Sequence, residues 1–161
     1  MLFESMVSST TDYSLYMIPA LWVVWMAPQV ARAVLTSRFT QQYSSAQPRV
    51  ENDPALLRGK VTQSQYNLLV RLKSAHENSL EFMVLAMPVL LMQHLPMAGT
   101  TIVSRNDFAA SIVALRAAYV VIYATQFAAG LAKLRSVAWM GGIFILVRTA
   151  IRVAGDISRK A

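Results

Sequence analysis

Two stretches of this chain place polar and ionisable side chains three or four residues apart, which is the spacing of one helix face. The first stretch contributes Arg71, Ser74, Asn78 and Glu81. The second contributes Arg116, Tyr119, Tyr123 and Gln126. Ionisable side chains at membrane depth are costly, so they face a bundle interior or a wet cavity and pair with one another. The spacing therefore predicts a polar pocket between two helices.

Several of these residues also have plainer interpretations. Lys73 and Glu77 stand four residues apart and are expected to form a solvated ion pair. Glu81 and Arg116 form a structural ion pair between helices in one interpretation, which is compatible with a nearby site. A lone histidine such as His76 is more often an interface residue than a catalyst.

No metal site is expected. His76 and His94 lie on one predicted helix, about 27 Å apart at the helical rise of about 1.5 Å per residue, so they cannot share an ion. The chain has no cysteine. It therefore carries no thiol of its own, and any sulfur chemistry must come from a bound small molecule. No glycine-rich phosphate loop or nucleophile elbow is present.

Long apolar segments must position these side chains in a chain that is 55% hydrophobic. Each is near the length of about 17 to 25 residues that crosses the hydrocarbon of a bilayer as a helix. Lipid offers the backbone no hydrogen-bond partners, and the alternation typical of barrel strands is missing, so helices are expected. A soluble all-α bundle with unusually apolar helices is the alternative. The segments are 15–35, 80–97, 108–130 and 137–153.

The predicted fold is an all-α integral membrane protein, an antiparallel bundle of four transmembrane helices that forms a single domain over residues 1–161. Thr62 and Gln65 fit a capping box, which predicts that the second helix begins near Gln63. This helix exceeds the membrane thickness, so its first turns stand at the interface, and Pro88 is expected to kink it. The predicted helices cover about 14–36, 63–95, 106–130 and 136–155, with a cytosolic loop over about 37–62.

Charge indicates the orientation. The net charge of +7 comes from bases in membrane-flanking loops rather than on one soluble face, so nucleic acid is not an expected partner. The excess of bases in the first and third loops places these loops in the cytosol and both termini across the membrane. The charges near the N-terminus, Glu4 and Asp12, are acidic, unlike those of a signal peptide. We therefore expect the first segment to be an uncleaved helix.

Three motifs occur in order along the last three predicted helices. They are Arg71-x-x-x-Ala75-His76-x-Asn78-x-x-Glu81, Arg116-x-x-Tyr119-x-x-x-Tyr123 and Leu134-Arg135-Ser136. Together they resemble the MAPEG family, the membrane-associated proteins of eicosanoid and glutathione metabolism, and among its members the microsomal glutathione S-transferases and prostaglandin E synthase. The resemblance extends weakly to the end of the first helix, where Arg38 precedes Gln47-Pro48-Arg49.

The resemblance implies a homotrimer that holds glutathione as cofactor in a cytosol-facing site between neighbouring subunits. A lipophilic substrate would enter from the membrane lipid, and the endoplasmic reticulum is the expected location. Arg38 would come from the neighbouring subunit. By matched position, the resemblance implies that glutathione is bound by Arg38, Arg71, His76, Asn78, Glu81, Arg116, Tyr119 and Tyr123.

Arg135 and Ser136 match the pair that the family places at the sulfur, and Tyr123 completes the implied catalytic set. A thiol has a pKa near 8.5, which a low-dielectric site raises, so a guanidinium and a hydroxyl are needed to hold a thiolate at neutral pH. The thiolate then attacks an electrophilic carbon or a peroxide. The implied activity is a glutathione-dependent transferase or peroxidase, or an isomerase.

Two alternatives follow from departures from the family pattern. Ser74 stands where several members have an arginine, and the link before Arg135 is longer than in the prostaglandin synthase. One alternative is a glutathione-independent isomerase or cyclase that uses Tyr123, His76 and Arg116 for acid-base catalysis on a lipid or terpenoid-like substrate. The other is a non-enzymatic lipid-binding scaffold, which the retained Arg135 and Ser136 disfavour.

Overall fold

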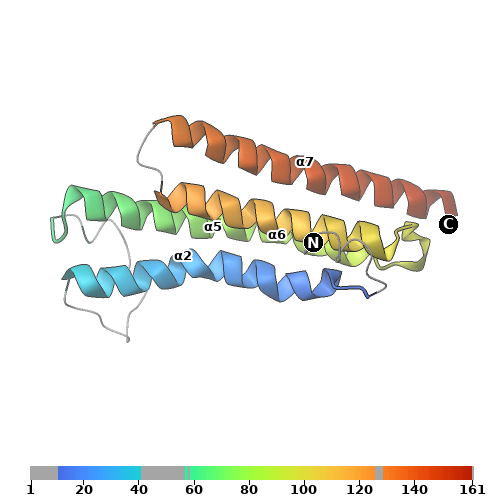
Figure 1. The fold of residues 1–161 in the computed structure, drawn as a ribbon, viewed down its shortest axis with the longest axis horizontal. Coiled ribbons are helices and arrows are strands. Elements are labelled where there is room, and N and C mark those ends of the chain that lie inside the picture. Colours follow the sequence, from blue (N-terminus) through green and yellow to red (C-terminus); the bar gives the residue numbers. More distant parts are fainter. Residues whose placement is uncertain (1–10, 41–56, 58, 126–128, 161) are drawn as a thin grey trace, which may run out of the picture.

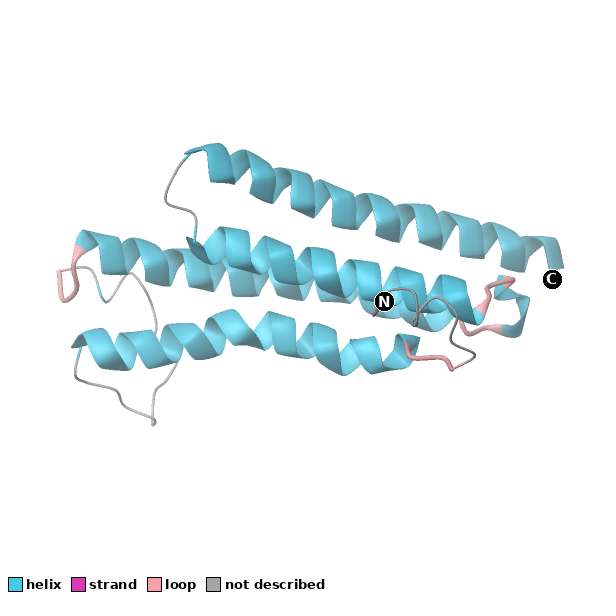
Figure 2. Cartoon of the chain, in the orientation of Figure 1, coloured by secondary structure: helices cyan, strands magenta, loops and turns pink. Residues whose placement is uncertain are grey.

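The structure is a computed structural model that describes residues 11–40, 57, 59–125 and 129–160, with side chains from residue 133 onward in the last range. These residues form four long helices and two short 3-10 helices (Figures 1 and 2). In chain order the elements are η1 (Ser14–Tyr16), α2 (Met17–Thr40), α5 (Gln63–Met92), η2 (Pro96–Ala98), α6 (Ile102–Thr125) and α7 (Ala129–Lys160).

The four long helices lie side by side along the long axis of the molecule, with α5 and α6 at the centre (Figure 1). Both central helices contact α2 on one side and α7 on the other. Apolar side chains at helical spacing on the facing surfaces are removed from lipid and water and form one core. The core contains Leu21, Phe82, Met83, Ala86, Val89, Leu90, Phe108, Ala109, Ile112 and Leu146.

The start of α5 is confirmed at Gln63. The Thr62 hydroxyl accepts a hydrogen bond from the Gln65 backbone N–H, and the Gln65 side chain accepts one from the Thr62 N–H. The predicted capping box therefore sets this helix end. α5 then runs without a break through Pro88 to Met92.

Several helix ends differ from the prediction. α2 covers Met17–Thr40 instead of about 14–36, so it includes the first residues of the predicted loop, and α5 ends at Met92 instead of about 95. α6 begins at Ile102 rather than Asn106, because Thr101 and Ser104 exchange backbone-to-side-chain hydrogen bonds of 3.1 and 3.2 Å that cap the helix earlier. It ends at Thr125, and the expected continuation to residue 130 includes 126–128, which lie outside the described residues. α7 runs from Ala129 to Lys160, so it exceeds the predicted 136–155 at both ends and continues through Gly155.

In the described residues, three helical segments are long and apolar enough to cross a membrane: Ser14–Thr40, Ile102–Thr125 and Lys133–Lys160. α5 was expected to be a fourth span and is not among them. Its first half carries the charged residues of the polar stripe, which lowers the hydropathy of the helix although its second half is apolar.

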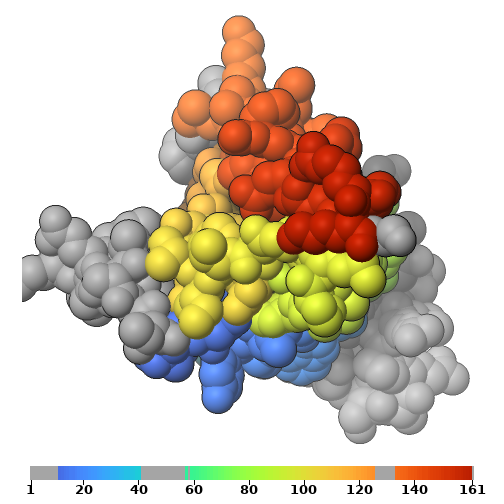
Figure 3. Space-filling model, turned by 90° about the vertical axis from the view of Figure 1, so that its right-hand side faces the viewer, coloured from blue at the N-terminus to red at the C-terminus, as the bar shows by residue number. Residues whose placement is uncertain are grey.

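The end of the bundle at η1 and η2 is closed by polar contacts between the N-terminal segment and α6. The Tyr13 N–H donates to Asn106 Oδ1 at 2.8 Å, and Arg105 donates to Asp12 at 2.7 Å. Figure 3 views the molecule from this end, where the N-terminal segment in blue lies against α6 in yellow. These contacts fix the first helix against the α5–α6 turn.

Asp12 also accepts a 2.6 Å hydrogen bond from the buried Ser14 hydroxyl, which lies 2.9 Å from His94 Nε2. Burial alone would raise the pKa of Asp12. The hydrogen bonds from Ser14 and Arg105 and the Arg105 charge outweigh it and hold this pKa below its usual value. His94 therefore belongs to a structural contact at this end of the bundle.

Candidate functional site

A cavity of about 350 Å³ opens between α5, α6 and α7. It brings together five residues that the sequence predicted to share a site, from all three motifs: Asn78, Tyr119, Tyr123, Arg135 and Ser136. Trp139 and Met140 complete its lining, and the sequence analysis missed both. Their spacing of three and four residues from Ser136 along α7 was the available signal.

The aromatic rings of α6 organise this cavity. Tyr119 and Tyr123 stand one helical turn apart, with ring centroids 5.6 Å from each other and ring planes at 67°. The guanidinium carbon of Arg135 lies 4.5 Å from the Tyr123 ring centroid. A cation over an aromatic face is attracted by the ring quadrupole. Tyr123 therefore holds the first turns of α7 against the end of α6.

Arg116 continues this arrangement behind the cavity. Its guanidinium carbon lies 4.1 Å from the Tyr119 ring centroid and 5.0 Å from that of Phe82. The side chain is buried, and its Nε donates a 3.2 Å hydrogen bond to the Ser79 hydroxyl, while its Nη2 is buried without a hydrogen-bond partner in the described residues. Arg116 thus packs against the ring of Tyr119 and does not itself line the cavity.

Glu81 and Arg116 make no direct ion pair in the described residues, although the Glu81 charge still acts on Arg116 from a longer distance. Arg116 instead has Ser79 as its hydrogen-bond partner on α5. Ser79 belongs to the buried face of α5, on which Ala75, Ser79, Phe82 and Ala86 recur every three or four residues. The sequence analysis missed Ser79 because it followed the neighbouring face.

The polar atoms that face this cavity are only partly used within the chain. Asn78 donates its amide N–H to the Ser74 carbonyl oxygen at 2.8 Å, which leaves the amide oxygen as an acceptor. The hydroxyls of Tyr119 and Tyr123 have no hydrogen-bond partner in the described part of the chain. A bound molecule therefore meets an amide oxygen and two phenol hydroxyls beside Arg135 and Ser136.

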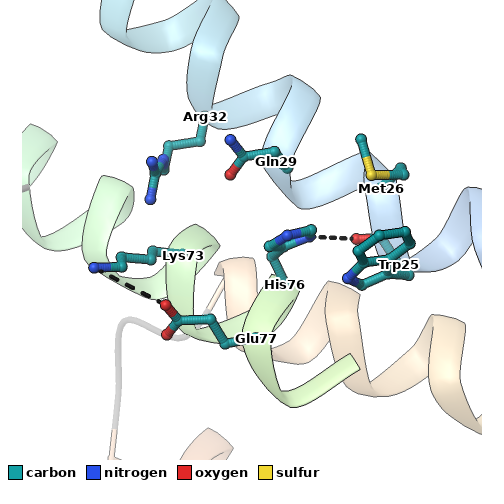
Figure 4. Close-up of a pocket in the computed structure, with 7 residues that line it drawn as sticks. All are labelled: Trp25, Met26, Gln29, Arg32, Lys73, His76 and Glu77. Carbon is teal, nitrogen blue, oxygen red and sulfur yellow. Dashed lines mark hydrogen bonds and ion pairs between the residues drawn. The ribbon is translucent and has the colours of Figure 1, made fainter. Parts of the chain in front are cut away.

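His76 lies on the other side of α5, in a cavity of about 480 Å³ between α2 and α5 (Figure 4). Its Nδ1–H donates to the Trp25 carbonyl oxygen at 3.0 Å, and its ring stacks on that of Trp25 with centroids 5.0 Å apart. Lys73 and Glu77 form the expected exposed ion pair at 3.9 Å in the same cavity. His76 is therefore not brought together with Tyr123 and Arg116 within this chain.

The structure places the remaining predicted residues elsewhere. Arg38 lines a separate cavity near the end of α2, with Ala33, Val34 and Ser37. Arg71 is half-buried and, like Glu81, lines none of the cavities described above. Gln126 lies outside the described residues. The described residues contain no group of histidines and acids that could hold a metal ion.

The described helices, three of them long and apolar enough to span a bilayer, define an all-α membrane protein with a polar cavity between its helices. The pattern of the MAPEG family matches residues 15–155, most of the chain, and the chain belongs to this family. Comparison with curated proteins and with solved structures gives no match. The family is one of membrane proteins of glutathione and eicosanoid metabolism, which agrees with the resemblance seen in the motifs.

Proposed function

We propose that this protein is a membrane-embedded enzyme that activates the thiol of glutathione against a lipophilic substrate, as a transferase or peroxidase, or as a related isomerase. The observation that carries the proposal is the shared cavity of Arg135, Ser136, Asn78, Tyr119 and Tyr123. These residues come from three motifs far apart in the sequence. Their convergence is unexpected for residues with unrelated structural roles.

The donor set of the cavity fits the thiol end of glutathione. When bound, glutathione supplies the sulfur nucleophile. Arg135 would offset the negative charge of the thiolate, and the Ser136 hydroxyl would donate a hydrogen bond to it, so that the pKa of the thiol falls toward neutral pH. Tyr123 would orient the guanidinium through the ring contact at 4.5 Å, and Asn78 would accept from a peptide N–H.

Glutathione also has two carboxylates, and in the described residues Arg135 is the sole cation that lines this cavity. The proposed homotrimer supplies the rest, with Arg38 coming from the neighbouring subunit. Val137, Met140 and Phe144 on α7 are more than half exposed in the single chain, so lipid or a neighbouring subunit must cover them.

A lipophilic substrate would reach the cavity from the bilayer. Trp139 and Met140 line the cavity and are exposed on the outer side of α7, so they connect it to the apolar surface. The cavity lies toward the end of the bundle at which α2 ends, α5 begins and α6 is followed by α7. The excess of bases there supports a cytosolic site, which we propose for an endoplasmic reticulum membrane.

The test is spectroscopic. Purified protein in detergent with millimolar glutathione should show the ultraviolet absorbance of a thiolate at neutral pH, and Arg135→Ala should lose it. Arg159→Gln is the matched control, because Arg159 pairs with Asp156 at the other end of α7. Absence of glutathione binding by the unaltered protein at millimolar concentration would refute the proposal.

One observation favours a second candidate, a glutathione-independent isomerase or cyclase. The cavity offers one cation where glutathione needs more, and Ser74 replaces an arginine of the family pattern. Because His76 lies on the far side of α5, such an enzyme would use Tyr123 and Arg135 instead of the trio of Tyr123, His76 and Arg116. Turnover of a lipid substrate with glutathione omitted would distinguish it from the first candidate.

A further inference from the structure

A third cavity, of about 270 Å³, lies between α6 and α7 toward the end of the bundle that carries η2. Arg148 and Arg152 from α7 and Asp107 from α6 line it, together with the Ser111 hydroxyl. Its apolar part is formed by Phe108, which is buried, and Ile145. Nothing in the proposed function uses this cavity, because Arg135 and Ser136 lie at the opposite end of α7.

The charges of this cavity have no partners in the described residues. Arg148, Arg152 and Asp107 are exposed, and none makes a hydrogen bond or an ion pair with a described residue. Nearby charges are paired, since Arg105 contacts Asp12 and Arg159 contacts Asp156. Unpaired charges within a membrane-spanning segment are costly unless a ligand or water compensates them.

The depth of the cavity points to the membrane interface. Asp156 and Lys160 lie beside Gly99 in the α5–α6 turn, which marks the end of the bundle. At about 1.5 Å per residue, Arg152 lies about 6 Å and Arg148 about 12 Å from the level of Asp156. The hydrocarbon core is about 30 Å thick and the headgroup regions extend the bilayer to about 40–45 Å. With Asp156 at the outer edge of a headgroup region about 5–7.5 Å thick, Arg152 lies where the headgroups meet the acyl chains, and Arg148 lies one helical turn deeper, from which its long side chain extends toward the headgroups.

We propose that this cavity binds the headgroup of a membrane phospholipid that carries an amine. A phosphate diester between Arg148 and Arg152 would satisfy both guanidinium groups, whose forked donors suit phosphate oxygens. Asp107 would pair with the ammonium, and the acyl chains would lie along Ile145 and the apolar surface of α7. A fatty acid fits less well, because its carboxylate would leave Asp107 unpaired.

The proposal is tested by native mass spectrometry on the detergent-solubilised full chain. Phosphatidylethanolamine should bind more tightly than phosphatidylglycerol, and both more tightly than diacylglycerol. The double variant R148Q/R152Q should lose at least about tenfold in affinity for both phospholipids, since two charge-assisted contacts are removed. Asp107→Asn should abolish the preference for the amine headgroup, and the control Arg159→Gln should bind as the unaltered chain does.

Three results would overturn the proposal. Unchanged phospholipid binding in R148Q/R152Q would place the lipid elsewhere. Equal binding of free phosphoethanolamine at the same concentration would show a soluble-anion site. Loss of subunit association in the double variant, with lipid binding unchanged, would show that the face contacts a second copy of the chain. The glutathione-thiolate absorbance is expected to survive in R148Q/R152Q, so this proposal and the proposed function fail separately.

Discussion

Two cavities flank α5 at the same height and differ in how their polar groups are used. Glu77 lines the cavity toward α2, and the next residue, Asn78, lines the cavity toward α6 and α7. Toward α2, His76 donates to the Trp25 carbonyl and Glu77 pairs with Lys73, while the buried Trp25 Nε1 has no hydrogen-bond partner in the described residues. Toward α6 and α7, two tyrosine hydroxyls and an amide oxygen have no hydrogen-bond partner in the described residues.

The difference shows why composition alone does not identify a site. Both cavities contain arginine, aromatic and amide side chains, and the α2 cavity is the larger. A polar group with a partner inside the chain contributes to stability and has little left to offer a ligand. We therefore assign chemistry to the cavity where residues of all three motifs meet beside two tyrosine hydroxyls and an amide oxygen without partners, and a structural role to His76, whose ring is already engaged by Trp25.

The largest expected effect is that of Arg135→Ala on activity. Removal of the group that stabilises the reacting negative charge should lower kcat/KM with glutathione and an electrophile by about 10²- to 10³-fold. Arg135→Lys should recover only part of this loss, because lysine keeps the charge but not the flat contact with Tyr123. If Arg135→Ala left kcat/KM unchanged, the cavity would have no role in the reaction.

Tyr123→Phe should have a smaller effect. It removes the hydroxyl and keeps the ring that carries the Arg135 guanidinium at 4.5 Å. The loss of one hydrogen bond in the site corresponds to about a tenfold fall in kcat/KM. Tyr123→Leu, which removes the ring as well, should approach Arg135→Ala. Equal activity of the unaltered protein and Tyr123→Phe would restrict the role of Tyr123 to positioning Arg135.

His76→Ala provides the opposite test, on the α2 side. This substitution removes the stack on Trp25 and the hydrogen bond to its carbonyl, which should reduce the free energy of unfolding by about 1–3 kcal/mol. The apparent melting temperature in detergent should therefore fall by several degrees. The kcat/KM per folded molecule should stay within about twofold of that of the unaltered protein, because the residues that line the proposed site are unchanged. A large fall in kcat/KM at unchanged melting temperature would instead place His76 in the chemistry.

The smallest expected effect is that of Asp12→Asn, because the Asp12 carboxylate contacts Ser14 and Arg105 at the end of the bundle and lies outside the proposed site. Its lowered pKa means that its contribution to stability is complete above the ordinary value of 3.8 and is lost as the pH falls toward the folded-state pKa. Asp12→Asn should therefore flatten the dependence of melting temperature on pH below about 4 while leaving activity at neutral pH intact. A pH dependence identical to that of the unaltered protein would contradict this account.

The sequence predicted the fold class and the cavity better than it predicted the ends of the helices. The capping box at Thr62 was recognised because both partners are typical, whereas the Thr101–Ser104 cap was overlooked. Gly155 indicated a helix end, yet the pair Asp156–Arg159 lies in a helical turn beyond it. Glycine weakens a helix by about 1 kcal/mol, which the packing of a long helix can override.

Spacing placed Asn78 on one polar helix face and Tyr119 and Tyr123 on another, and the family resemblance added Arg135 and Ser136; the structure brings all five to one cavity. Spacing did not separate His76 from Asn78. Two residues along a helix turn a side chain by about 200° at 3.6 residues per turn, so neighbours in a motif can face different helices. The helix that each side chain faces depends on how α5 packs against its neighbours, and the motif does not predict that packing.

The contact of Arg135 with Tyr123 couples the cavity to the angle between α6 and α7. The two helices are joined by a short link, and α7 is held at its far end where it contacts η2. Any pivot of the start of α7 away from α6 separates the guanidinium from the ring and widens the cavity toward the bilayer. Trp139, on the moving wall, gives the protein an intrinsic fluorophore at the entrance. Opening for a bulky apolar substrate would thus be visible in the emission of an unlabelled molecule.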